Sequence, residues 1–336
     1  MKEFKVVNKI FVRSSNEVFK ILKRYTIALI IFILSIIAIN LYKGNYQNII
    51  NIIIATIITS LISIIFQYFI NLNRGKKSIT TIFKEDNILA SSLIITLFTY
   101  QEPIIVVIVA SIITEIARLI NRHINISSCL YGILFVLIYK QFYLNIDTPL
   151  INLTNKNYYG TYQDIVLSYG SIKSYLLGTN GYYLSPILSI IAFIYLFFKK
   201  SIKYPPVISY LTTFTISMFI YGLFDGMNIW FVIFQIITGD ILFLSIFTLG
   251  DYKITPITQE GQTIYGIILA IITIILRFII PELSVVIPLI LGPLILTKQL
   301  DKLSYKLKYS HKLYYTLLTS SIAITGLIIL IISFIY

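Results

Sequence analysis

Residues 25–41 of the chain are YTIALIIFILSIIAINL, and residues 49–70 are IINIIIATIITSLISIIFQYFI. Neither stretch contains a charged side chain. A helix needs about 20 predominantly apolar residues to cross the roughly 30 Å hydrocarbon layer of a bilayer. We therefore expect two membrane helices at the start of the chain. Residues 1–24 are basic and are not followed by a cleavage site of small residues, so we interpret them as a cytoplasmic arm.

The composition of the whole chain agrees with a membrane protein. Of its 336 residues, 57% are hydrophobic and 12% are charged, and the mean hydropathy is +0.86. A soluble domain has about 45–50% apolar and about 25% charged residues, so a soluble enzyme is excluded. The single cysteine, Cys129, excludes a disulfide framework and a cysteine-based metal centre built by this chain alone. The two histidines are too few for a histidine-metal centre, and we expect no metal site.

Nine further apolar segments follow the first two. A break at residues 101–103 indicates either a tilted hairpin or broken helices that line a cavity. The pattern predicts an all-α polytopic membrane protein of about ten spans, arranged as two five-helix halves plus one extra C-terminal helix. The eleven segments lie at about 25–41, 49–70, 87–99, 104–120, 124–139, 184–198, 206–224, 229–249, 262–280, 283–297 and 313–335. The predicted divisions are an arm at 1–24, a first half at 25–139, an outer loop at 140–183, a second half at 184–300 and the extra helix at 301–336.

The distribution of positive charge predicts the orientation. Lysine and arginine accumulate on the cytoplasmic side of membrane spans. If the chain starts inside and changes sides at each segment, 22 of the 27 Lys and Arg residues are cytoplasmic. The five exceptions are Lys43, Lys140, Lys156, Lys173 and Arg277. The net charge of +13 is thus explained by membrane topology, and we expect no nucleic-acid partner.

One acidic residue is predicted to lie in the middle of a span. Asp240 follows Gly239 within the apolar sequence QIITGDILFLSIF. Ionisable residues inside membrane helices are candidates for a functional role. Asp240 is either a cation or proton site, or a carboxylate satisfied by neighbouring Ser, Thr or Tyr hydroxyls.

Two other groups of ionisable residues have structural explanations. Glu115 precedes Arg118 by three residues, a spacing that predicts an ion pair on the helix surface. Arg277 and Glu282 flank a proline at the predicted outer boundary. There we expect either pairing between them or snorkelling of the arginine to the membrane interface.

Residues 251–266, DYKITPITQEGQTIYG, form the most informative motif of the chain. This motif resembles a segment of the RnfD/NqrB family, which comprises the RnfD membrane protein of the Rnf electron transport complex and the related NqrB membrane protein of the sodium-pumping NADH:quinone reductase. Tyr252 stands where the family usually has proline. The matching residues are Asp251, Pro256, Thr258, Gly261, Tyr265 and Gly266.

Three further segments resemble the family in the same order along the chain, and the similarity extends from about residue 12 to about residue 300. The first contains Arg13 and Ser14; the second contains Pro206, Val207, Ser209 and Tyr210; the third contains Arg277, Pro281, Glu282 and Pro293. The family architecture is also two five-helix halves around a central outer loop.

The resemblance implies a membrane component of an ion-translocating oxidoreductase. In this family, electrons pass from ferredoxin to NAD or from NADH to quinone, and their passage is coupled to sodium or proton translocation. The resemblance also implies partners, namely other membrane and peripheral subunits, and a bacterial cytoplasmic membrane as location. The alternative is a secondary transporter or channel that uses the same scaffold without redox activity.

The family carries FMN linked through phosphate to a threonine of the outer loop. By position, the best match is Thr148 in Asn-Ile-Asp-Thr-Pro-Leu at 145–150, and Thr161 is a second candidate. The small residue before the family threonine, and the serine three positions before it, are absent here. An ordinary Thr-Pro turn at Thr148 is the alternative. The expected cofactor is therefore FMN, attached covalently or bound without a tether, or riboflavin.

Overall fold

The computed structural model describes residues 15–73, 88–120, 128–143, 174, 176–178, 183–227, 229–251 and 254–307. Its elements are all helical, which confirms the predicted all-α class. We refer to the first five helices as the N-terminal set: α1 (Ser15–Tyr42), α2 (Tyr46–Asn73), α4 (Ile88–Thr99), α5 (Ile104–Ile120) and α6 (Ser128–Tyr143).

The C-terminal set contains several broken helices. It starts with α10 (Pro186–Phe198), α11 (Tyr204–Phe224), α12 (Ile229–Ile237), α13 (Ile241–Leu244) and the π-helical η1 (Ser245–Leu249). It continues with α14 (Gln259–Ile279), the 3-10 helix η2 (Pro281–Leu283), α15 (Val286–Leu291) and the π-helical η3 (Gly292–Leu296). The last described helix is α16 (Thr297–Leu307).

Helix length and composition support a multi-pass membrane protein. Four helices are long and apolar enough to cross a membrane, and the bent pair Ile229–Ile237 and Ile241–Leu249 would make a fifth. The other apolar helices among the described residues have 10–17 residues. The count of about ten spans therefore stays a prediction, and the predicted segment 313–335 lies outside the described residues.

The break at residues 101–103 is the turn of a helical hairpin between α4 and α5. The backbone N–H of Glu102 donates to the carbonyl of Thr99 at 2.9 Å, and the carbonyl of Pro103 accepts from Val106 at 2.9 Å. Both helices pack against α2 and against each other. Of the two predicted alternatives, the hairpin is the one observed.

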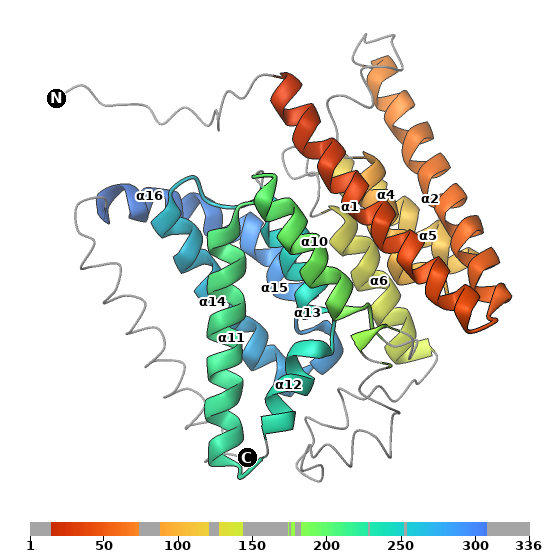
Figure 1. Ribbon diagram of the computed structural model, residues 1–336. Helices are drawn as coiled ribbons and strands as arrows, with labels where there is room; N and C mark the ends of the chain where they lie inside the picture. Colours follow the sequence, from red (N-terminus) through yellow and green to blue (C-terminus); the bar gives the residue numbers. More distant parts are fainter. Residues whose placement is uncertain are drawn as a thin grey trace.

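The two helix sets share one order of contacts. In the N-terminal set, α2 contacts α4 and α5, α5 contacts α6, and α1 contacts α4. In the C-terminal set, α11 contacts α12 and α14, α14 contacts α15, and α10 contacts α13. Corresponding helices, such as α1 and α10, run in opposite directions (Figure 1). An inverted repeat produces this arrangement, whereas the predicted boundaries of the two halves stay predictions.

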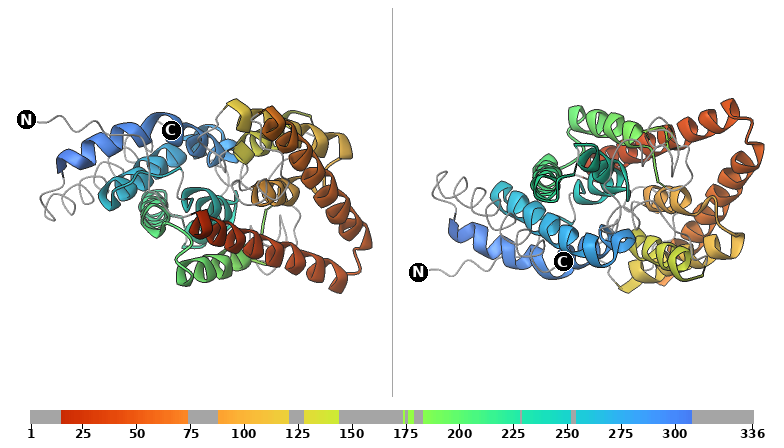
Figure 2. Two further views of the ribbon diagram at one scale, coloured as in Figure 1. Left: turned by 90° about the horizontal axis from the view of Figure 1, so that it is seen from above. Right: turned by 90° about the horizontal axis from the view of Figure 1, so that it is seen from below.

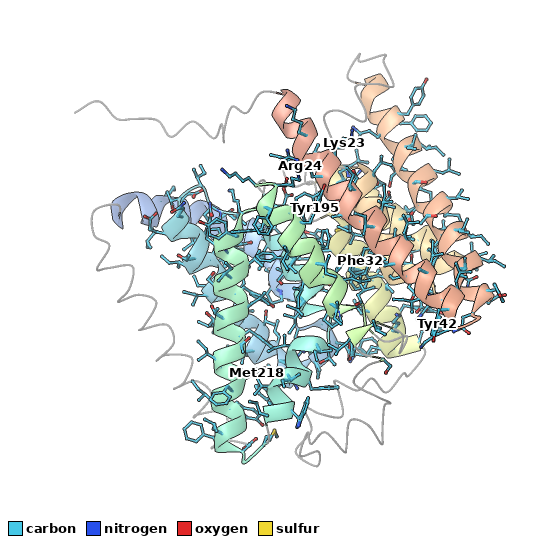
Figure 3. All side chains as sticks on the ribbon, in the orientation of Figure 1. Lys23, Arg24, Phe32, Tyr42, Tyr195 and Met218 are labelled. Carbon is cyan, nitrogen blue, oxygen red and sulfur yellow. The ribbon has the colours of Figure 1, made fainter. Side chains whose placement is uncertain are left out.

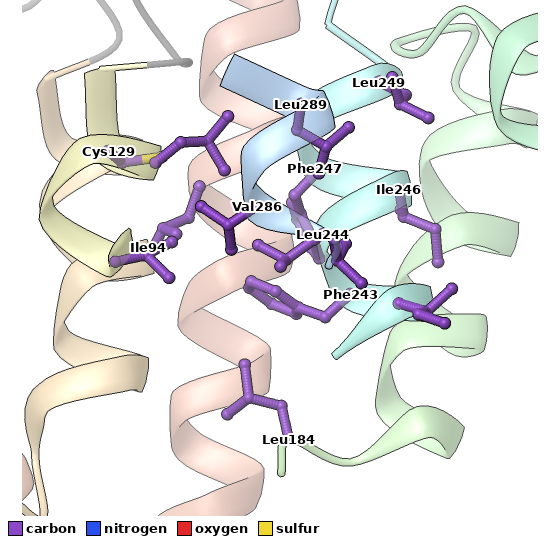
Figure 4. Packing of buried hydrophobic residues seen from close by; sticks show 14 of the residues in the cluster. Ile94, Cys129, Leu184, Phe243, Leu244, Ile246, Phe247, Leu249, Val286 and Leu289 are labelled. Atoms are coloured by element: carbon purple, nitrogen blue, oxygen red, sulfur yellow. The ribbon is translucent and has the colours of Figure 1, made fainter. Parts of the chain in front are cut away.

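The sets meet through α1 with α10 and through α6 with α15, and views along the perpendicular direction place the two sets side by side (Figure 2). An apolar seam fills the space between them (Figure 4). Its centre is Phe243 of α13. The centre of the Phe243 ring lies 5.3 Å from the ring centre of Phe32, 5.9 Å from that of Phe98 and 4.7 Å from that of Phe247. The buried apolar contacts of this seam hold the two sets together.

The outer faces of α1 and α2 are apolar and exposed. Ile31, Leu34, Ile57 and Leu61 each leave about half of their surface uncovered, and side chains project outward along both helices (Figure 3). In water such a surface would be an aggregation hazard, whereas acyl chains cover it without cost. At the end where α1 begins, the side chain of Arg24 joins the two sets by donating to the carbonyl of Lys199 at 2.5 Å.

Candidate functional site

The predicted span at 229–249 is broken at Gly239 and Asp240. Helix α12 ends before them and α13 begins after them, with a bend of 53°. Both residues have left-handed backbones, with φ of 69° and 54°. Glycine adopts this conformation without strain, and aspartate does so more readily than most residues. Asp240, which is predicted to lie in the middle of a span, therefore lies at the break between the two helices of that segment.

The carboxylate of Asp240 is held by the chain segment that follows the long loop. Its Oδ1 accepts a hydrogen bond from the backbone N–H of Leu184 at 2.7 Å. This partner is an amide, not one of the hydroxyls considered above. The charges that act on Asp240 are those of Lys140 from the N-terminal set and of Glu282 and Arg277 from the C-terminal set.

The side chain of Arg277 caps the C-terminal end of α12, next to the helix break. Its guanidinium donates to the side-chain oxygen of Gln235 at 3.0 Å, to the backbone carbonyls of Gln235 at 3.0 Å and Thr238 at 3.2 Å, and to Ser284 Oγ at 3.2 Å. It also lies 5.7 Å from the centre of the Phe214 ring. A cation at a helix C-terminus satisfies carbonyls that lack an intrahelical partner and interacts favourably with the helix dipole.

Both predicted roles of Arg277 are thereby corrected. Its side chain is fully buried, so it does not snorkel to an interface. Its hydrogen bonds go to neutral oxygens instead of to Glu282. The guanidinium needs the space beside Gly239, because a Cβ atom there would lie 2.5 Å from Arg277 Nη1.

Five charged side chains, which we name the Asp240 cluster, gather around this break. Glu282 accepts from the hydroxyl of Tyr183 at 2.9 Å. Lys140 Nζ lies 3.2 Å from Glu102 Oε1. Among the described residues, three carboxylates lie near two cationic side chains, so these five groups together carry an excess negative charge when all are ionised. The cluster consists of Glu102, Lys140, Asp240, Arg277 and Glu282.

A second group of buried charges, the Glu115 cluster, lies within the N-terminal set. Glu115 Oε2 is 3.0 Å from Arg118 Nη1, which confirms the predicted spacing of the pair. Glu115 Oε1 accepts from Ser63 at 2.7 Å, and Arg118 also donates to Ser91. The predicted location was wrong, because neither charged side chain is on the helix surface. Packing of α2 and α4 against α5 covers both of them.

The residues of the motif at 251–266 form the start of α14. Asp251 is buried, and its backbone carbonyl accepts from the Thr255 hydroxyl at 3.3 Å. The carbonyl of Pro256 accepts from Lys203 Nζ at 3.1 Å. Thr258 caps α14, since its hydroxyl oxygen accepts from the backbone N–H of Gly261 at 3.1 Å. These contacts organise a turn and a helix end.

At Gly266, the motif at 251–266 packs against the segment that contains Pro206 and Ser209. A Cβ atom at Gly266 would overlap with Ser209 Oγ and with the carbonyl oxygen of Pro206, so α11 and α14 approach closely here. Tyr265, the preceding motif residue, is fully buried. At 1.5 Å per residue, the start of α14 is about 27 Å along the helix from Arg277 and Gly266 is about 17 Å from it. The motif therefore contributes packing away from the Asp240 cluster.

Sequence reasoning missed Gln235, Tyr183, Glu102 and Lys140 as neighbours of the site. A usable signal existed for Gln235, a single amide in the apolar run before Gly-Asp. The other three are distant in sequence and show no pattern. The predicted tether residues, Thr148 and Thr161, lie outside the described residues. Among the residues that the structure describes, no three His, Cys, Asp or Glu side chains gather as metal ligands.

Together, the apolar helices, the broken helix and the buried charges define a polytopic membrane protein with an internal polar site at a helix discontinuity. Residues 5–291 match the model of the NQR2, RnfD, RnfE family. The match covers most of the chain, which therefore belongs to this family of membrane subunits of Rnf- and Nqr-type complexes. This result confirms the resemblance found in the sequence. No protein with a curated description matches the chain significantly.

Proposed function

We propose that this chain couples flavin-mediated electron transfer to the movement of sodium ions or protons in an Rnf-like complex. It would contact other membrane and peripheral subunits in a bacterial cytoplasmic membrane, with its N-terminus in the cytoplasm. Family membership supports the complex. The observation that carries the ion-coupled part of the proposal is the Asp240 carboxylate at a break in a membrane helix.

The Asp240 cluster has the chemistry of a cation site. Carboxylate and carbonyl oxygens are the ligands that hard cations prefer. The hydrogen bond from Leu184 uses one lone pair of one Asp240 oxygen, which leaves further acceptor positions on the carboxylate. A proton or a monovalent cation would compensate the excess negative charge. Discontinuous helices at membrane depth present ion sites in this way in transporters.

The outer loop would hold the flavin, with Thr148 as the tether and Thr161 as the second candidate. A threonine hydroxyl fits this attachment: its oxygen replaces the leaving group on the phosphorus of an activated flavin phosphate supplied by a flavin transferase, and its proton goes to solvent. When bound, the flavin supplies one- and two-electron transfer. At the described edges of the loop, Lys140 and Tyr183 are engaged with Glu102 and Glu282, so they hold the loop ends in place.

The loop end provides a physical link between the two parts of the proposal. Leu184, which follows the loop, donates directly to Asp240, and its neighbour Tyr183 donates to Glu282. A displacement of the loop would therefore change the hydrogen bonding and the charge environment of the proposed ion site.

The ion site is tested by Asp240→Asn in the assembled complex reconstituted in vesicles. We expect electron transfer to continue, while sodium or proton uptake per electron decreases at least tenfold. Asp225→Asn is the matched control, because Asp225 is an exposed aspartate at the end of α11. Normal ion uptake in Asp240→Asn would make Asp240 a structural residue and refute this part of the proposal.

The tether is tested by in-gel flavin fluorescence after denaturation, with the chain co-expressed with a flavin transferase. We expect a fluorescent band for the wild type and for Thr161→Ala, and its loss in Thr148→Ala. Loss in Thr161→Ala alone would assign the tether to Thr161 instead. A wild-type chain without fluorescence would refute covalent attachment.

A secondary transporter or channel is the second candidate, because the helix break and the inverted order of contacts also suit solute transport. Purified chain in vesicles distinguishes the two. Ion flux that needs no electron donor, and that Asp240→Asn abolishes, would favour the transporter. Flux that requires a donor and the partner subunits would favour the redox-coupled function.

A further inference from the structure

Helix α16 is the last described helix of the C-terminal set and packs against α14 and η3. It continues directly from η3 and extends sideways from the end of the molecule where α14 begins (Figures 1 and 2). Its N-terminal half is docked there, since Asp301 Oδ1 accepts from the backbone N–H of Ile257 at 2.8 Å and the side chain of Leu300 is buried. The family match ends at residue 291, before α16 begins.

The sequence of α16, TKQLDKLSYKL, separates two kinds of residue around the helix. At 100° per residue, positions 300, 303 and 307, which are all leucine, share one stripe. Positions 298, 302 and 306, which are all lysine, share another stripe on the far side of the helix. Leu300 packs against the protein, whereas Leu303 leaves 49% of its surface uncovered. Leu303 of the apolar stripe is therefore not covered by the described part of the protein.

The segments on either side of α16 are apolar. On its N-terminal side, Leu294 and Ile295 of η3 are exposed apolar residues. On its C-terminal side, the sequence 313–335 is again apolar. A helix between two such segments lies beside the headgroup layer.

The chemistry of its two stripes matches that layer. Leucines on one face and lysines on the other are typical of helices that lie in the plane of the interface. Lysines near the surface are attracted to anionic lipids, each by about fivefold in binding. A soluble acidic partner would match the lysines but would leave the exposed leucine stripe in water.

We propose that α16 is an interfacial helix that binds anionic phospholipid, with Leu303 in the acyl-chain boundary and the lysines of the opposite stripe among the phosphate headgroups. This role is independent of flavin and of ion transport. It would fix the loop that contains Ile257, and with it the start of α14, relative to the membrane surface.

The depth of the helix is the first test. The full chain carrying Leu303→Cys is labelled with a nitroxide and reconstituted in vesicles of phosphatidylcholine with 30% phosphatidylglycerol. Cys129 is fully buried and is shielded from the reagent. The nitroxide should collide more often with oxygen, which concentrates in the bilayer, than with a water-soluble nickel chelate. The reference is Ile57→Cys on the exposed face of α2, which should lie deeper. Equal access of Leu303→Cys to the nickel chelate and to oxygen would place it in water and overturn the proposal.

The lipid charge is the second test. In vesicles of pure phosphatidylcholine, the label at position 303 should become several-fold more accessible to the nickel chelate. The double variant Lys298→Gln/Lys302→Gln should show the same increase in vesicles that contain phosphatidylglycerol. The matched control removes the same charge with Lys199→Gln and Lys200→Gln, which lie in the turn after α10, and should leave accessibility unchanged. Equal effects of both pairs, or no dependence on phosphatidylglycerol, would overturn the proposal.

Discussion

Arg118 and Arg277 occupy the same place in the two helix sets, two residues before the end of α5 and of α14, yet they have different partners. Arg118 forms an ion pair with Glu115 on its own helix, and the nearby helix α4 is continuous. Arg277 donates to carbonyls at the end of α12, which is broken. In the C-terminal set the arginine donates to neutral oxygens at the helix break, and the carboxylate of Asp240 accepts from a backbone amide instead of pairing with this arginine. The same position thus supports an intrahelical ion pair in one set and a helix end in the other, and the proposed ion site depends on this difference.

The largest expected effect comes from removing either arginine and then attempting a rescue. Arg118→Met and Arg277→Met should each reduce the free energy of unfolding by about 3–5 kcal/mol, because buried polar groups lose their partner. Adding Glu115→Gln should restore most of the stability of Arg118→Met. Adding Asp240→Asn should restore little to Arg277→Met, whose lost partners are carbonyls. SDS titration of each double-mutant cycle measures the coupling, and equal coupling in both cycles would contradict the comparison.

The helix break itself is tested by Gly239→Ala. A left-handed alanine costs about 1–2 kcal/mol, and contact of its Cβ with Arg277 should add about 1–3 kcal/mol. Gly44→Ala is the control, because Gly44 has a similar φ of 74° but nothing within 4 Å of a new Cβ. Thermal unfolding in detergent should show a clearly larger loss for Gly239→Ala, and an equal loss would mean that the guanidinium does not need this space.

Each set contains a close helix approach at a glycine, Gly132 in one and Gly266 in the other, and alanine at these two positions should have similar effects. A Cβ at Gly132 on α6 would overlap with Thr114 Oγ1, and a Cβ at Gly266 on α14 would overlap with Ser209 Oγ. Alanine at either position should cost about 1–3 kcal/mol through overpacking. At Gly222, where the nearest atom is 3.5 Å away, alanine should be neutral or stabilising by up to about 1 kcal/mol. Thermal unfolding of the three variants checks the order.

The smallest expected effect concerns the motif at the start of α14. Thr258→Ala should cost about 1 kcal/mol by removing the N-cap, and Thr258→Ser should retain most of that stability. Ion uptake per electron should stay normal in both variants, because this end of α14 is distant from Asp240. A selective loss of ion coupling in Thr258→Ala would mean that the functional site extends to the motif.

Much of the helical framework could be predicted from the sequence. Uncharged runs such as 25–41 and 49–70 became α1 and α2, and the three-residue spacing of Glu115 and Arg118 became an ion pair. The break at Asp240 was missed, since Gly-Asp in an apolar run is compatible with a continuous helix. The burial of Arg277 was also missed, because its partners belong to another helix and are not visible in local sequence.

The sequence by itself determined the solvent and the class of secondary structure. A chain this apolar must lie in lipid, and there each segment satisfies its backbone hydrogen bonds internally by forming helices. Only the tertiary structure decided which buried charges meet. Asp240 and Leu184 are separated by 56 residues, Arg277 and Gln235 by 42, and Tyr183 and Glu282 by 99. Such contacts depend on how whole helices pack, and that packing turns one predicted span into a broken helix with a carboxylate at its centre.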